Sequence, residues 1–206
     1  TRRTFLGCAA ALTSAATLSV LAQSAFPNRP VRWVVGYPPG GGTDALARNV
    51  GQQLSSQLGQ PVVVDNRPGA AGIIGAQTAA KSPPDGYTVL TADNGILVYN
   101  AALYKNLPYD PLKDFTSIGL MAKIQLLLIA SPQSGYTSAK QLLDFAKANP
   151  GKLSYATPGA GSPHHLAMEL FKAATGLHMV HIPYRGSAPA LNDVMGGQVP
   201  LMLLDL

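Results

Sequence analysis

Short apolar runs alternate with amphipathic segments along this chain, a pattern typical of strands alternating with helices. Residues 31–35 have the β-branched and aromatic content of a buried strand, and Leu46, Val50, Leu54 and Leu58 form a helical stripe. Further strands are predicted at 62–64, 87–91, 125–130, 153–157, 180–184 and 201–206, and further helices at 73–81, 137–148, from 163 onward and around 187–195. This order favours an α/β fold with parallel strands, whose ligands bind beyond the carboxyl ends of the strands.

A glycine-rich loop at residues 36–44 joins the first strand to the first helix. Thr43 is the predicted N-cap, so the free N–H groups and positive dipole end of the helix would face back into the loop. The loop is therefore predicted to hold a carboxylate or a phosphate, although a tight turn explains it equally well when it is considered alone. It lacks the Gly-Lys-Ser/Thr ending of a nucleotide-binding P-loop.

The second half of the chain repeats this element. Residues 153–157 lead through a glycine-rich loop to Ser162, the predicted N-cap, and to Pro163 at the first position of a helix with Leu166, Leu170 and Ala174 on one stripe. Two such loops facing each other across a cleft would hold one anion from both sides. We therefore predict a first domain at residues 23–121 and a second at 122–206, after an irregular connection at 108–116.

The N-terminal 22 residues are predicted to be an export signal. The first seven, TRRTFLG, resemble a twin-arginine signature, and an uncharged Ala/Leu-rich run follows from Cys8 to Ala22. We expect cleavage after Ala22, with cleavage after Ala25 or an uncleaved anchor as alternatives, and a periplasmic location. The mature chain would then contain no cysteine and so no disulfide.

Composition and charge remove several classes of function. The 206 residues are 47% hydrophobic and 12% charged, with a formal net charge of +5, or +5 − 2 = +3 without Arg2 and Arg3, and no basic block suggests nucleic acid. Adjacent His164 and His165 would diverge by about 100° on a helix, so we expect no metal, and we expect no cofactor. A serine hydrolase is disfavoured because Ser162 does not stand in a Gly-x-Ser-x-Gly turn.

Five motifs taken in order carry a resemblance to a known family. They are YPPGGGTD at 37–44, DNRPGAAG at 65–72, SPPDGY at 82–87, HIPYRG at 181–186 and GGQV at 196–199. Together they resemble the Bug family, the extracytoplasmic solute receptors of tripartite tricarboxylate transporters. The resemblance runs from about Pro27 to the last residue.

The resemblance implies a type II periplasmic-binding fold of two α/β domains with a hinge. A small organic acid would be closed between them: a di- or tricarboxylate, an aromatic acid or an acidic amino acid. It further implies a monomer that works with the membrane components of such a transporter. The family's chain continues past Leu206 to complete the first domain, so we expect the C-terminal part to be missing here. The ligand-binding residues predicted in this way and from the strand ends are Tyr37, Gly41, Gly42, Thr43, Asp44, Thr91, Asp93, Asn94, Thr157, Gly159, Gly161, Ser162, His165, Tyr184 and Asp205.

Two residues depart from the family pattern. Pro158 stands where a small hydroxyl residue or glycine is expected, which removes a donor from the second loop. Asp93 adds a negative charge that would repel a second carboxylate or favour a ligand with an amino group. The competing interpretation is an α/β hydrolase or transferase that uses the glycine loops as an oxyanion or phosphate site, with Asp44, Asp93 and His165 as its acid–base set.

Overall fold

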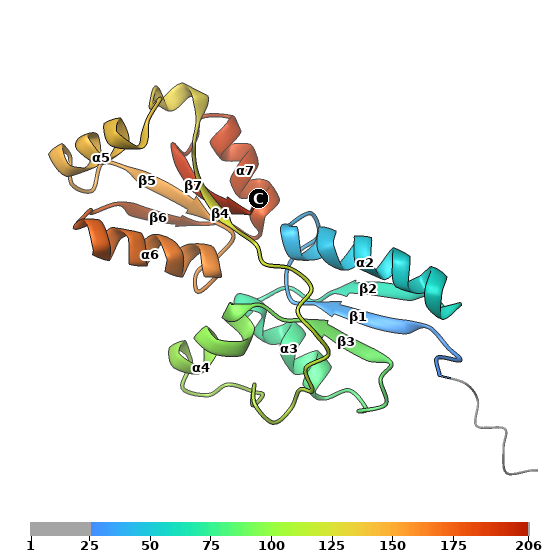
Figure 1. Cartoon of the computed structure of the whole chain (residues 1–206). Coiled ribbons are helices and arrows are strands. Elements are labelled where there is room, and N and C mark those ends of the chain that lie inside the picture. The colour runs from blue at the N-terminus through green and yellow to red at the C-terminus, as the bar shows by residue number, and fades with distance from the viewer. Residues whose placement is uncertain (1–25, 206) are drawn as a thin grey trace, which may run out of the picture.

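The computed structural model describes residues 26–205, which form two separate β-sheets with helices packed on them (Figure 1). The first sheet has the order β2-β1-β3, and its strands β1 (Val31–Val35), β2 (Val62–Asn66) and β3 (Thr88–Thr91) are all parallel. We call the part of the chain built around this sheet the first lobe.

The second sheet, which defines the second lobe, has the order β4-β7-β5-β6. Its strands are β4 (Leu126–Ala130), β5 (Ser154–Thr157), β6 (Val180–Pro183) and β7 (Leu201–Asp205). Strands β5, β6 and β7 are parallel, whereas the edge strand β4 runs antiparallel to β7. The expectation of a parallel sheet is confirmed for the first lobe and is wrong for β4.

Helices of the first lobe follow each strand and cover the sheet. They are α2 (Gly42–Leu58), α3 (Ile73–Ala80) after a short 3₁₀ turn (Ala70–Gly72), and α4 (Asn100–Leu103) after a π-helical turn (Gly95–Tyr99). Trp33 and Val35 on β1 are buried with Ala47 of α2 on one side of the sheet, and Ile73 and Ile96 are buried in a cluster on the other. The helices therefore bury the apolar run that predicted β1.

The second lobe has three longer helices and a short 3₁₀ turn (Pro132–Ser134). They are α5 (Ala139–Ala148), α6 (Pro163–Thr175) and α7 (Ser187–Met195). Tyr155, Met168 and Leu201 are fully buried in a core shared by β5, α6 and β7. A second cluster around Ala156, Val194 and Met202 joins α7 to the other side of the sheet.

Three predictions of local structure are wrong. Thr43 is not the N-cap of α2, because Gly41 takes that position and no side chain caps the helix. In α6, Leu170 is 70% exposed while Met168 is buried, because apolar residues lie on more than one face and the stripe was assigned to the wrong one. The strand predicted at 62–64 is too short, because Asp65 and Asn66 extend β2.

An irregular stretch at 104–125 leads from the first lobe to β4 (Figure 1). It includes the predicted connection at 108–116, and the exact boundary between domains stays a prediction. The predicted export signal lies outside the described residues. Within residues 26–205, none of the helices combines the length and the apolar character needed to cross a membrane.

Candidate functional site

The first glycine loop ends at the N-terminus of α2, which points toward the second lobe. Ala45 N–H donates the first bond of the helix to Gly41 O at 3.0 Å. The N–H groups of Gly42, Thr43 and Asp44 therefore precede the first hydrogen bond of the helix and have no acceptor within the described chain. These amides, together with the helix dipole, form the positive end of α2.

The buried side chain of Asp44 fixes the shape of this loop through hydrogen bonds. Its carboxylate accepts hydrogen bonds from Gly40 N–H at 3.0 Å, Arg48 Nε at 3.0 Å and Asn66 Nδ2 at 2.9 Å. Burial alone would raise the pKa of Asp44, but these donors hold the pKa below its usual value. All of these donors belong to the protein, so the carboxylate supports the loop conformation.

The second glycine loop is closed by the cap predicted from the sequence. Ser162 Oγ accepts His165 N–H at 3.2 Å, and Pro163 occupies the first turn of α6. Gly159 N–H donates to Thr157 Oγ1 at 3.3 Å, and Gly161 N–H donates to His165 Nδ1 at 3.2 Å. The amides of Gly159 and Gly161 are therefore already hydrogen-bonded to side chains of the protein.

Two amides of the second loop are available to a ligand. Ser162 N–H bonds Gly159 O, whereas the N–H groups of Ala160 and His164 have no acceptor among residues 26–205. The sequence prediction missed both residues. His164 was identifiable in principle, because the first N–H groups after an N-cap have no acceptor within their own helix.

Asp205, at the end of β7, lies between the two helix N-termini. A Cβ atom added to Gly42 would lie 2.7 Å from Oδ2 of Asp205. Oδ1 of Asp205 lies 2.8 Å from Nε2 of His164, which is close enough for an ion pair, although the geometry is not that of a hydrogen bond. The side chains of His164 and Asp205 are 10% and 18% exposed. A carboxyl group is therefore accommodated between the starts of α2 and α6.

The loop after β3 meets the first loop. A Cβ on Gly95 would lie 3.0 Å from Oδ1 of Asp93, 3.2 Å from the Tyr37 hydroxyl and 3.4 Å from Cδ of Pro163. The Tyr37 hydroxyl is buried and has no hydrogen bond of normal geometry within the described residues. Burial, and then the charge of Asp93, raise the pKa of Tyr37 well above its usual range.

Four predicted residues have other partners or another position. Thr91 Oγ1 accepts the indole N–H of buried Trp33 at 2.8 Å, and Thr157 Oγ1 lies 2.6 Å from Nε2 of His181. The Tyr184 hydroxyl donates to Asp193 at 2.6 Å, while burial and then Asp193 raise its pKa to about 12. Asn94 is exposed at the start of the π-helical turn.

The two lobes touch at both glycine loops. A Cβ on Gly41 would lie 3.5 Å from Oγ of Ser187, and one on Gly161 would lie 3.3 Å from Cβ of Ala71. Ala71 has a left-handed φ of 52°, which is unusual for a residue with a side chain, and Asn100 Nδ2 donates to its carbonyl at 3.0 Å. Ala71 and Asn100 were not predicted, because neither residue type signals a site in the sequence.

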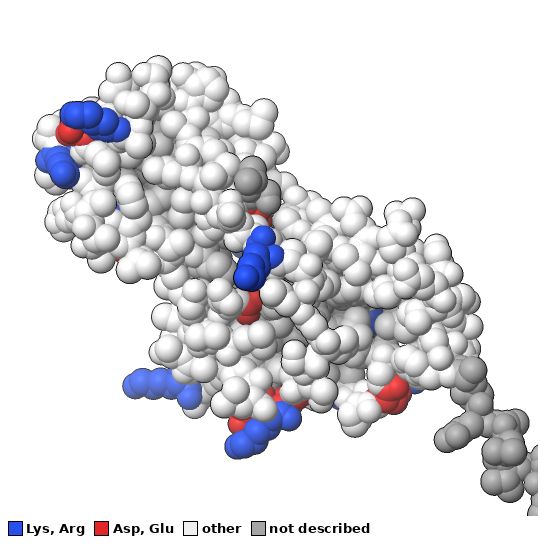
Figure 2. Space-filling model, in the orientation of Figure 1, with Lys and Arg blue, Asp and Glu red and all other residues white. Residues whose placement is uncertain are grey.

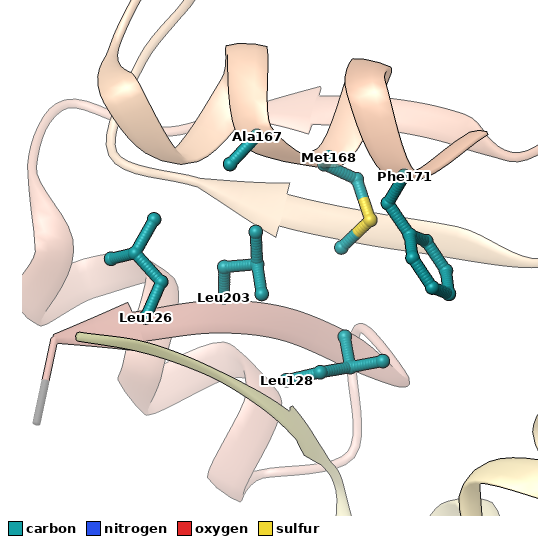
Figure 3. Close-up of a pocket in the computed structure, with 6 residues that line it drawn as sticks. All are labelled: Leu126, Leu128, Ala167, Met168, Phe171 and Leu203. Atoms are coloured by element: carbon teal, nitrogen blue, oxygen red, sulfur yellow. The ribbon is translucent and has the colours of Figure 1, made fainter. Parts of the chain in front are cut away.

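A cavity of about 230 Å³ in the second lobe is apolar, and the side chains of α6 face those of β4 and β7 across it (Figure 3). It is lined by Leu126, Leu128, Ala167, Met168, Phe171 and Leu203. On the face seen in Figure 2, lysine and arginine are scattered over both lobes. Residues 26–205 contain no group of three His, Cys, Asp or Glu side chains placed to hold a metal ion.

Two α/β lobes whose helix N-termini meet around one carboxyl group define the class of the two-domain periplasmic binding proteins. Comparison with family models agrees, because residues 46–206 match the model of the tripartite tricarboxylate transporter family receptor (TctC). The chain belongs to this family, as its resemblance to the Bug receptors predicted.

Curated relatives support this assignment along the whole chain. A protein of Pseudomonas sp. strain P51 from the tcbD-tcbE intergenic region is 42% identical over 98% of this chain. The protein BugT of Bordetella pertussis is 38% identical over 91% of it. The alignments cover 60% and 58% of those proteins, so this chain spans about three fifths of the length of its relatives.

Solved structures give the same fold. A protein described as a periplasmic transporter is 44% identical with a TM-score of 0.85, and an R. palustris protein solved with adipate is 40% identical with a TM-score of 0.85. MatC from Rhodopseudomonas palustris, with bound malate, is 31% identical with a TM-score of 0.80. Each match covers 87–88% of this chain and 60–61% of the other. The predicted type II periplasmic-binding fold is confirmed.

Proposed function

We propose that this protein is a periplasmic receptor that captures a small organic carboxylate and delivers it to the membrane components of a tripartite tricarboxylate transporter. In this proposal residues 1–22 direct export, and residues 23–121 and 122–206 form the two domains that close on the ligand. The receptor is a monomer and catalyses no reaction. Family membership and the periplasmic descriptions of its structural neighbours support this function.

The observation that carries the proposal is the carboxyl group of Asp205 between the N-termini of α2 and α6. This carboxyl group lies beside Gly42 on one lobe and beside the imidazole of His164 on the other. Gly42, Thr43 and His164 have unbonded backbone N–H groups at the same two helix starts. Helix N-termini attract anions through their free amides and dipoles. A ligand carboxylate would bind to these amides after Asp205 moves aside, without needing a lysine or arginine.

The acidic side chains around the site restrict the rest of the ligand. Asp93 lies beside Tyr37, and Asp205 lies beside Gly42, so a second carboxylate of the ligand must be directed away from both. An amino group on the ligand would instead be attracted to these carboxyl groups. Adipate and malate, which are bound by the structural neighbours, are the first candidates, and acidic amino acids and aromatic acids are the alternatives.

Isothermal titration calorimetry with adipate, malate, aspartate and benzoate tests the proposal. We expect one of these acids to bind at a single site and to raise the melting temperature by mass action. NMR of the same mixtures should show the acid unchanged after prolonged incubation. A cooperatively melting protein that none of the acids stabilises would contradict the receptor, and conversion of an acid would favour the hydrolase or transferase.

A further inference from the structure

Three aromatic rings form a stack behind the second glycine loop. The imidazoles of His165 on α6 and His181 on β6 lie with centroids 4.0 Å apart and planes 17° apart. Tyr155 on β5 stacks on the other side of His181, at 5.1 Å and 20°. The pairing of β5 with β6 places Tyr155 opposite His181, so the stack is built into the sheet register.

Each imidazole is bonded to one end of the loop. His181 Nε2 lies 2.6 Å from Thr157 Oγ1, and the same oxygen accepts Gly159 N–H at 3.3 Å. His165 Nδ1 accepts Gly161 N–H at 3.2 Å. The loop between Thr157 and Ser162 is therefore held at both ends by the two rings, and Ala160 with its unbonded N–H lies between the two attachment points.

Burial outweighs the charge of Glu169 and lowers the pKa of both rings, which favours their neutral forms. Glu169 Oε1 lies 3.7 Å from His165 Nε2, but this carboxylate already accepts the ammonium of Lys172 at 2.7 Å and the hydroxyl of Tyr155. Burial lowers the pKa of His165, and burial followed by the nearby His165 ring lowers the pKa of His181 to about 4. Two cationic rings in contact would repel each other, so the second proton is strongly disfavoured.

Protonation has a specific geometric consequence at His165. A neutral ring that accepts Gly161 N–H at Nδ1 carries its own proton on Nε2, facing Glu169. An added proton must go to Nδ1 and would set two N–H donors against each other at 3.2 Å. The amide of Gly161 must then turn away, and Gly161 borders Ala71 and Tyr104 of the first lobe.

We propose that His165 and His181 are positioning residues that hold the second glycine loop in its anion-binding form only while both rings are neutral. The inference rests on the proposed function of this loop and makes anion binding weaker in acid. A histidine that touched the ligand directly would have the opposite effect, because its positive charge would strengthen the binding of an anion.

Calorimetry with adipate and malate between about pH 4.5 and 7.5 distinguishes these two roles, because both rings titrate below the ordinary histidine pKa of about 6.5. We expect affinity to fall roughly five-fold toward the acid end, the equivalent of one hydrogen bond. His165→Leu, which removes the acceptor, should bind roughly five-fold more weakly throughout. The double variant His165→Asn/His181→Gln keeps polar atoms near the loop but does not titrate at these positions, so its affinity should depend less on pH. His178→Asn, at an exposed position, serves as the control.

NMR of the ligand-free chain tests the positioning directly. The amide resonance of Gly161 should shift with the same midpoint as the His165 ring, and His165→Asn should abolish the shift. A Gly161 amide that does not respond while His165 titrates, or an affinity that rises in acid, would overturn the inference and leave the receptor function intact. Failure of all acids to bind would reject the receptor function, while the Gly161 titration would still decide the role of the histidines.

Discussion

Asp44 illustrates how a residue predicted to bind ligand can instead shape the site. Its side chain is 5% exposed and accepts donors from the loop, from β2 and from its own helix. A ligand carboxylate would be repelled by this charge if the donors did not balance it. The free amides of Gly42 and Thr43, directly before Asp44, can therefore attract an anion, because the charge of Asp44 is already neutralised by Arg48.

Replacing Asp44 by alanine should destabilise the protein. Asp44→Ala leaves Gly40 N–H without its acceptor and removes one of the two acceptors of the Asn66 amide, so the free energy of unfolding should fall by about 1–3 kcal/mol. Asp144→Ala is the matched control, because Asp144 forms an i,i+4 pair with Lys140 at an exposed position and should cost less than about 0.5 kcal/mol. Equal losses in urea unfolding would refute the bracing role.

The stacked histidines predict how stability depends on pH. In the folded protein, the pKa values of both rings lie below the ordinary histidine value of about 6.5. The pKa of His181 is lowered to about 4. Within this window the unfolded chain binds more protons, so the free energy of unfolding should decrease as the pH falls from about 6.5 toward 4. The double variant His165→Asn/His181→Gln should have a flatter dependence in urea unfolding. An unchanged slope would mean that other groups cause the acid sensitivity.

At the scale of single elements, the caps decide where the site amides point. Ser162 and Ser138 are both serine N-caps, on α6 and α5, and each accepts the N–H three residues along at 3.2 and 3.3 Å. Of these two helices, only α6 starts at the candidate site. The two residues therefore provide a matched pair in which a similar loss of helix stability has different consequences for binding.

Ser162→Ala and Ser138→Ala should each lower the free energy of unfolding by about 1 kcal/mol. Ser162→Ala should also weaken adipate binding by roughly five-fold, because His165 N–H loses its acceptor and the start of α6 loosens beside the ligand. Ser138→Ala should leave the affinity unchanged. Urea unfolding and calorimetry measure the two effects separately. If both variants bound equally well, the start of α6 would not be part of the site.

Local signals in the sequence were sufficient for the elements that carry the site. The glycine loops and the Ser162–Pro163 helix start depend on neighbouring residues, and they were predicted correctly. The cap of α2 was assigned to Thr43, because a threonine signals a cap more strongly than Gly41 does. The π-helical turn after Asp93 was missed, since its residues Gly95–Tyr99 carry no helical period.

Features that depend on distant contacts were not predictable. The antiparallel direction of β4 follows from its pairing with β7, in which Leu128 lies opposite Leu203, far along the sequence. The stack of His165 on His181 requires the register of β5 with β6 and the packing of α6. A single sequence gives the strands but not their partners, so the contact between His165 and His181 was not predicted.

At the scale of the whole molecule, the contacts between lobes have the character of a closed form. Gly41 lies against Ser187, Gly186 lies against Pro38, and Gly161 lies against Ala71. Periplasmic binding proteins close two domains around a ligand by a hinge motion. The glycines at these contacts allow the two lobes to approach closely. A larger side chain there should therefore hinder closure of the lobes more than it destabilises either lobe.

Ser187→Trp should therefore weaken ligand binding without unfolding the protein. Ser187 begins α7 and lies against Gly41, so a bulky side chain would wedge the lobes apart. Overpacking costs about 1–3 kcal/mol, and 1.4 kcal/mol corresponds to ten-fold, so adipate affinity should fall roughly ten-fold. Met195→Trp, at the other end of α7 where Met195 is 62% exposed, should bind normally. Small-angle scattering should show compaction with adipate in Met195→Trp but not in Ser187→Trp. Normal affinity in Ser187→Trp would exclude this contact from the ligand-bound form.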